Sequence, residues 1–172
     1  MFPELRQAVL DAAPRAEVHQ AIQRIYTELQ AEIDRRQPLC SLSGRCCRFE
    51  EFGHRLYITT MELAAFLRDF PPVESLPEPL RRSLATWDNT GCPFQLARLC
   101  GLHTIRPFGC RIFFCDPTAT LWQNDLYERF HSQLKRLHES LAVPYFYVEW
   151  RDALRAILPP NLTPNPSSLT SD

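Results

Sequence analysis

The chain carries seven cysteines, and all of them lie between residues 40 and 115 of its 172 residues. Three are in a first segment and four in a second: Cys40, Cys46, Cys47, Cys92, Cys100, Cys110 and Cys115. The N-terminal residues lack the basic start and apolar run of a secretory signal, so we expect a cytoplasmic protein whose thiols stay reduced. In such a compartment, clustered cysteines indicate metal ligands first and redox or nucleophilic thiols second.

The spacing of these thiols fits no standard motif. The second segment has 7, 9 and 4 residues between successive cysteines, which is neither a zinc ribbon nor a complete ferredoxin run. In the first segment Gly44 permits a tight backbone, and the adjacent Cys46 and Cys47 need a turn to reach one metal, or else serve different centres. The sequence therefore predicts that two loops bring their sulfurs together.

Arginines are frequent around the thiols. Between residues 40 and 115 there are nine arginines and seven acidic residues. Four thiolates on zinc or on an oxidised four-iron cluster leave a net negative charge, which arginines can offset while donating hydrogen bonds to sulfur. We expect Arg106 and Arg111 to contact such a cofactor, with Arg45 and Arg48 nearby. His103 is the histidine placed to act as a ligand or proton carrier.

Helices must position these loops. Val18, Ile22, Ile25, Leu29 and Ile33 recur at helical spacing and predict a helix over residues 15–36. Further helices are predicted over 60–69, opened by a capping box at Thr59, over 80–87 and over 120–158, where an extended segment at 145–150 interrupts them. A short strand is predicted at 55–59. The expected fold class is mostly α with short strands, in a single domain over residues 1–158. Its cysteine-rich loops (40–115) pack among helices around a metal centre. We expect the proline-rich tail, 159–172, to be disordered.

Composition excludes several partners. Nineteen basic residues against 20 acidic ones give a net charge of −1, which provides no basic surface for nucleic acid or an anionic membrane. No run approaches the ~20 apolar residues that span a bilayer. No phosphate-binding loop, dinucleotide fingerprint or catalytic carboxylate pair is present, so the sequence indicates no substrate.

The second cysteine segment resembles a known signature. Cys92-Pro93-Phe94, then Cys100, and then Arg106-Pro107-Phe108-Gly109-Cys110-Arg111-Ile112-Phe113 are similar to the signature of the YkgJ-type cysteine-cluster family, also described as a zinc- or iron-chelating domain. The first segment resembles the other half of that signature, with Ser43 where the family has its second cysteine. His103 stands where the family has tyrosine. The resemblance covers about residues 40 to 115.

The resemblance implies a metal centre, iron–sulfur or zinc, in a small bacterial cytoplasmic protein of unsettled activity, and it favours iron–sulfur. Cys46, Cys47, Cys92 and Cys110 are the first expected ligands, Cys40 and Cys100 the next and Cys115 the last. Without a cysteine at position 43, Cys115 is either a substitute ligand or an incidental thiol.

Three hypotheses of function follow. The first is a metal-binding protein, an electron carrier with a redox partner or a protein whose fold depends on its metal. The second is an enzyme in which Cys46 or Cys110 is a nucleophile or redox thiol, activated by Arg111 or His103. The third is an interaction module, in which a metal only staples the loops and helix 120–141 binds a protein partner.

Overall fold

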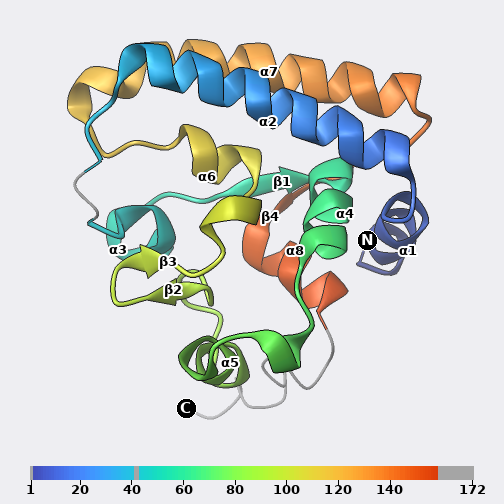
Figure 1. Cartoon of the computed structure of the whole chain (residues 1–172), viewed down its shortest axis with the longest axis horizontal. Helices are drawn as coiled ribbons and strands as arrows, with labels where there is room; N and C mark the ends of the chain where they lie inside the picture. The colour runs from blue at the N-terminus through green and yellow to red at the C-terminus, as the bar shows by residue number, and fades with distance from the viewer. Residues whose placement is uncertain (1, 41–42, 159–172) are drawn as a thin grey trace.

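The computed structural model describes residues 2–40 and 43–158, and within them a mostly helical fold (Figure 1). The α-helices are α1 (Phe2–Ala12), α2 (Ala16–Arg36), α3 (Phe49–Phe52), α4 (Thr60–Asp69), α5 (Glu78–Ala85), α6 (Phe108–Ile112), α7 (Thr120–Ser140) and α8 (Trp150–Ile157). Single 3₁₀ turns are η1 (Arg45–Cys47), η2 (Val73–Ser75), η3 (His103–Ile105) and η4 (Pro117–Ala119). The strands are β1 (Tyr57–Thr59), β2 (Gln95–Leu96), β3 (Leu99–Cys100) and β4 (Tyr147–Glu149). The prediction of a mostly α fold with short strands is confirmed.

The two longest helices, α2 and α7, lie side by side along one edge of the molecule (Figure 1). The predicted apolar stripe of α2 is buried from Val18 to Ile33, and α7 buries Leu126, Phe130 and Leu134 on the facing side. Burial of these stripes stabilises both helices, since most of the stability of a helix in a protein comes from packing of its apolar face.

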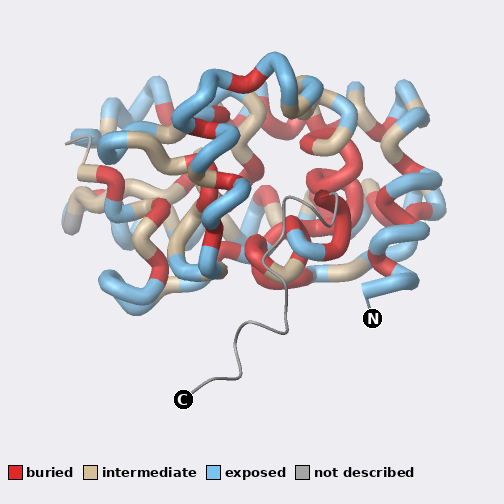
Figure 2. The backbone as a smooth tube through the Cα atoms, turned by 90° about the horizontal axis from the view of Figure 1, so that it is seen from below, coloured by how far each residue is buried: buried red, intermediate tan, exposed pale blue. Residues whose placement is uncertain are grey.

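Helix α4 lies in the interior and packs against both α1 and α2. Figure 2 shows buried backbone concentrated toward the middle of the molecule, with exposed segments around it. The predicted capping box is present: the Thr59 side chain accepts from Glu62 N, and Thr59 N donates to Glu62 Oε2 at 3.0 Å. The sequence reading assigned no element to residues 2–12, which form α1.

Two small antiparallel ladders connect the helices. Strand β1 pairs with β4, with Ile58 opposite Val148, and so joins the first cysteine segment to the C-terminal part of the chain. Strands β2 and β3 form a hairpin in which Gln95 is opposite Cys100. The extended segment at 145–150 and the helix after it are thus confirmed, with the helix beginning at Trp150.

The predicted disordered tail, 159–172, lies outside the described residues. Within residues 2–40 and 43–158, no helix has both the length and the apolar character that crossing a membrane requires.

Candidate functional site

The two cysteine segments meet backbone to backbone. Cys92 N donates to Cys47 O at 2.8 Å. Gly91 makes this approach possible, because its φ is +59° and a Cβ there would lie 2.9 Å from Cys47 O. Gly44, at φ +70°, starts the η1 turn that carries the adjacent cysteines, as the sequence predicts.

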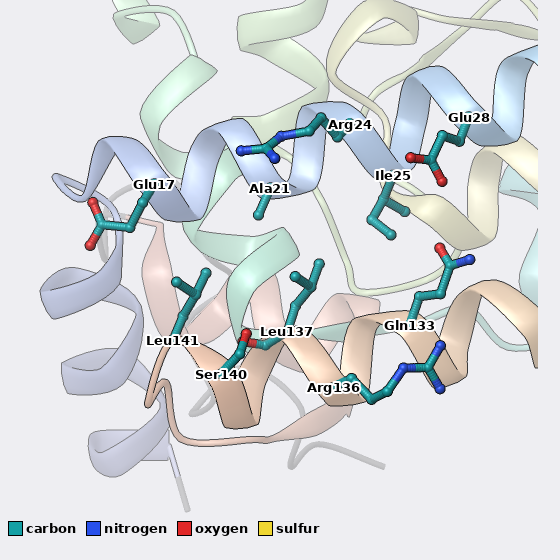
Figure 3. Close-up of a pocket in the computed structure, with 10 residues that line it drawn as sticks. All are labelled: Glu17, Ala21, Arg24, Ile25, Glu28, Gln133, Arg136, Leu137, Ser140 and Leu141. Carbon is teal, nitrogen blue, oxygen red and sulfur yellow. The ribbon is translucent and has the colours of Figure 1, made fainter.

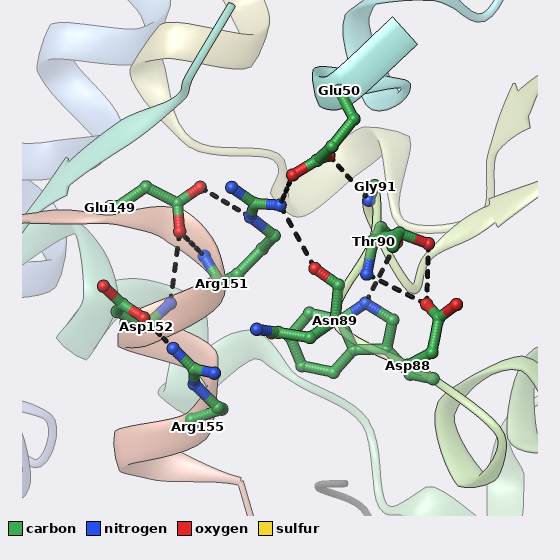
Figure 4. Close-up of polar contacts among 10 residues, drawn as sticks. Glu50, Asp88, Asn89, Thr90, Gly91, Glu149, Arg151, Asp152 and Arg155 are labelled. Atoms are coloured by element: carbon green, nitrogen blue, oxygen red, sulfur yellow. Dashed lines mark hydrogen bonds and ion pairs between the residues drawn. The ribbon is translucent and has the colours of Figure 1, made fainter. Parts of the chain in front are cut away.

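A buried arginine on α8 stabilises the contact between the two cysteine segments (Figure 4). Arg151 forms ion pairs with Glu149 and with Glu50 of α3, and its Nη1 donates to Asn89 O at 3.1 Å. Glu50 in turn accepts from Gly91 N at 3.4 Å. One guanidinium therefore holds the end of the first segment against the turn that leads to Cys92. Nothing in the spacing of the sequence indicated this role.

Three sulfurs form the centre of the cluster. Cys46 Sγ and Cys47 Sγ are 3.9 Å apart, and the Cys47 thiol also hydrogen-bonds to Cys92. The pKa of Cys46 is lowered to about 6, first by the hydrogen bond from Cys47 and also by the charge of Arg106. The hydrogen bond with Cys47 likewise lowers the pKa of Cys92, whereas the pKa of Cys47 is raised by its bonds to both neighbours. The Cys47 thiol thus lies between two thiols whose pKa values are lowered.

Cys100 on β3 and Cys110 on α6 complete a group of five. Burial raises the pKa of both thiols, and negative charge on Cys92 and Cys46 raises both further. These sulfurs therefore lie within electrostatic range of the central three. Helix α6 is fixed here because Phe108 N donates to the buried Glu62 carboxylate at 2.9 Å.

Cys40 and Cys115 have different surroundings from the five. Cys40 is exposed, and Cys115 Sγ lies 3.7 Å from Ser43 Oγ. The structure thus places Ser43, at the position where the resemblance implies a cysteine, in contact with the thiol that the sequence left as either a substitute ligand or an incidental thiol.

The predicted arginines lie around the cluster. The charge of Arg106 interacts with Cys46, Cys100 and Cys110, and its buried Nε has no partner among the described residues. Arg111 interacts electrostatically with Cys110, while its guanidinium carbon lies 4.2 Å from the centre of the Tyr26 ring. His103 is exposed.

Trp150 is a site residue that sequence reasoning missed. It is 2% exposed, and its Nε1 has no hydrogen-bond partner among the described residues. The Cys92 thiol lies near it, and Trp150 helps to lower the pKa of that thiol. Because a buried indole N–H normally has an acceptor, this unpartnered N–H is available to a group bound beside Cys92. The position of Trp150, far along the chain and outside both cysteine segments, gave no signal of this contact.

The donor chemistry of the cluster suits a sulfur-ligated metal. Thiolates are the preferred ligands of zinc and of iron–sulfur clusters, and unpartnered donors of Arg106 and Trp150 match an anionic, sulfur-rich guest. As they stand, however, no three His, Cys, Asp or Glu side chains of the described residues are arranged to hold an ion. In this arrangement Cys46 and Cys47 hydrogen-bond to each other, so metal binding requires deprotonation of thiols and movement of their side chains.

Two cavities differ in their relation to the thiols. The larger, about 570 Å³, lies between α2 and α7 and is lined by no cysteine; Ala21, Ile25, Leu137 and Leu141 form its apolar part, with charged side chains around them (Figure 3). The smaller, about 180 Å³, is lined by Cys46 and Cys110. The second cavity therefore gives a small molecule access to the cluster, as does a third of about 320 Å³, which is lined by Cys47 and Cys92.

In comparisons with known proteins, no family model, curated protein or solved structure matches this chain. The resemblance to the YkgJ-type family stays a prediction from the two cysteine motifs.

Proposed function

We propose that this chain is a metal-binding cysteine-cluster protein, in which thiols of the five-cysteine group hold an iron–sulfur cluster or zinc. The observation that carries the proposal is the convergence of Cys46 and Cys47 from one segment with Cys92, Cys100 and Cys110 from the other. With an iron–sulfur cluster the role is electron transfer to a protein partner.

The charge balance supports this proposal. The pKa values of Cys46 and Cys92 are both lowered beside the Cys47 thiol, whose pKa is raised. A divalent metal would replace the Cys47 proton, because metal binding to thiols releases protons. Arg106 supplies compensating positive charge at the cluster, and the buried donors lack other partners among the described residues.

The direct test is elemental analysis of iron, sulfide and zinc per chain after anaerobic purification, with an absorption spectrum. We expect stoichiometric metal in the wild type and its loss in Cys92→Ser, while Cys40→Ser, at an exposed thiol outside the group, retains it. A folded wild-type chain that is colourless and metal-free, and that takes up neither zinc nor iron with sulfide after reduction, would rule the proposal out.

A second candidate, a thiol-dependent enzyme, is favoured by one observation at Cys46. Its thiol is half-buried, lines the smaller cavity and has a pKa of about 6, chiefly because Cys47 hydrogen-bonds to it. Reactive cysteines are of this kind, partly accessible and stabilised as thiolates. The cation beside it is Arg106, whereas the sequence suggested Arg111 or His103 for this role.

Alkylation separates the two candidates. The enzyme candidate predicts that iodoacetamide labels Cys46 in reduced, metal-free protein at pH 7 at least tenfold faster than the exposed Cys40. The metal proposal predicts that Cys46 is protected until a chelator removes the ion. Slow labelling of Cys46 in both forms would exclude the enzyme candidate.

A further inference from the structure

The smaller cavity is lined by residues of η1, β1, α6 and α7 and of the segments next to them, beside the thiol cluster. Its floor is buried and apolar, from Leu56 before β1 and Ile112 of α6. Cys46 and Cys110 form its sulfur-lined part. Small-molecule sites in proteins are concave, mainly apolar and supplied with a few polar groups, and this cavity has that composition.

Aromatic rings form the sides of the cavity. His54 stacks on Phe113 with ring centres 4.7 Å apart and planes 14° from parallel, and Tyr57 and Tyr127 line it as well. Rings prefer to contact other rings in stacked or edge-on arrangements. At about 180 Å³ the cavity is slightly larger than the ~150 Å³ space that accommodates benzene in another protein. Its size and walls suit one aromatic ring with one small substituent.

Two polar side chains lie at the exposed rim of the cavity, while the buried Nδ1 of His54 has no partner among the described residues. Arg55 and Asn124 are exposed there, and Arg55 pairs with no carboxylate in the described part of the chain. Gln123 uses its Oε1 to accept from Phe114 N at 2.8 Å, which leaves its amide N–H groups as donors. A guanidinium flanked by amide donors recognises a carboxylate.

We propose that this cavity binds a single-ring aromatic carboxylate, with the ring beside Cys46 and Cys110 and the carboxylate at Arg55. The site goes beyond the proposed function and does not depend on a metal. It places a small organic molecule in contact with two thiols of the cluster.

The probe is benzoate, titrated into the full-length protein as purified and followed by calorimetry and amide NMR. We expect saturable one-to-one binding, with benzylamine binding at least tenfold more weakly because it brings a cation to Arg55. Amide signals around Gly109 and Asn124 should shift, whereas those of Ala21 and Ser140 in the α2–α7 cavity should not. Absence of saturable binding, or shifts confined to the α2–α7 cavity, would overturn the proposal.

Two variants locate the contacts. Asn124→Phe fills the rim from an exposed position of α7, and we expect it to weaken benzoate binding at least tenfold. Glu128→Phe places the same ring at an exposed position on the same helix, outside the cavity, and should leave affinity within twofold. Arg55→Gln should weaken benzoate at least tenfold but phenol less than twofold. Equal affinity of Asn124→Phe and wild type would refute the site, and equal losses of benzoate and phenol in Arg55→Gln would refute the carboxylate contact.

Discussion

Two parts of the molecule are stabilised in different ways. The first, here called the helical layer, consists of α2, α4 and α7. The second, here called the cysteine region, consists of residues 43–47 and 92–115. Helices α2 and α7 bury apolar stripes, and α4 is buried on all sides over its first seven residues. These helices are stabilised by the apolar area that folding removes from water. The cysteine region consists of single turns, two-residue strands and a five-residue helix. It is held by particular contacts, such as the bond from Cys92 N to Cys47 O and the ion pairs of Arg151.

This difference indicates that stability and metal binding are separable. A cavity in the helical layer should lower the free energy of unfolding of the whole chain without changing the thiol geometry. Damage to one contact in the cysteine region should release the metal at a smaller cost in global stability. The predictions below test that separation, from the largest effect to the smallest.

Leu29→Ala should have the largest effect on stability. Leu29 is fully buried in α2, and removing a buried leucine side chain costs about 2–5 kcal/mol. Urea denaturation should show this loss, while the metal content per folded molecule stays at the wild-type value. Leu121→Ala, at a side chain that is 83% exposed, is the control and should change the free energy of unfolding by less than about 0.5 kcal/mol. Loss of metal from folded Leu29→Ala would show that the two regions are not separable.

Gly91→Ala should damage the cysteine region specifically. Its Cβ would lie 2.9 Å from Cys47 O in a left-handed conformation, so the strain of positive φ adds to a clash with backbone at the junction. Gly53→Ala is a matched control, since Gly53 has φ +63° and nothing within 4 Å of its added Cβ. We expect about 1 kcal/mol of destabilisation from Gly53→Ala, a larger loss from Gly91→Ala, and at least tenfold weaker metal binding in Gly91→Ala alone. Equal metal affinity in the two variants would contradict this account.

Trp150→Phe removes the buried, unpartnered N–H near Cys92 and keeps an aromatic ring in place. We expect a loss of less than about 1 kcal/mol in the free energy of unfolding of the metal-free chain, because the described residues show no hydrogen bond to lose there. A structural role alone would not alter the electronic environment of sulfur, so a shift of the thiolate-to-metal absorption band is the deciding measurement. Trp122→Phe, at a half-buried ring beside Arg36, should leave that band unmoved. An unchanged band in Trp150→Phe would exclude the indole as a hydrogen-bond donor to the centre.

Periodicity predicted most of the helical layer. The patterns that predicted it each lie within one element. They are the apolar stripes from Val18 to Ile33 and from Leu126 to Leu134 and the capping box at Thr59. Helix α1 was missed, although it buries Leu5 and Val9. Local patterns of this kind identify an element without reference to the rest of the chain.

The thiols could be identified from the sequence, but their neighbours could not. The clustering of cysteines and the position of Gly44 are visible in the chain, as is the excess of arginine. Arg151, Trp150 and Glu62 contact the cysteine segments from distant positions, and no spacing rule relates them to the cysteines. Which thiols converge likewise depends on tertiary packing, which sets Cys40 apart from the five.

The smallest expected effect is a pH dependence located in the helical layer. His138 is 2% exposed; its Nδ1 donates to Val143 O at 3.1 Å, and its Nε2 accepts from Met61 N at 3.5 Å. Burial lowers the pKa of His138, against the opposing effect of its backbone hydrogen bonds. As the pH falls, His138 is therefore protonated in the unfolded chain before it is protonated in the folded chain. The contribution of the neutral His138 to the free energy of unfolding is fully present above pH 6.5 and is lost as the pH falls below that value. The loss between pH 7 and pH 6 is small, because only the start of this titration lies in that range.

Urea denaturation at pH 7, 6 and 5.5 tests this prediction. Stability should fall toward acid in the wild type, and His138→Gln should be less stable at pH 7 but should have a flatter pH profile. His131→Gln is the control, because His131 is only partly buried and burial is the main cause that lowers its pKa. This variant should therefore reduce the pH dependence of the free energy of unfolding by less than His138→Gln does. If the two regions are separable, the metal content should not change with pH in this way. His138 contacts α4 and the turn after α7, and its described contacts include no cysteine. An unaltered slope in His138→Gln would show that another group causes the acid destabilisation.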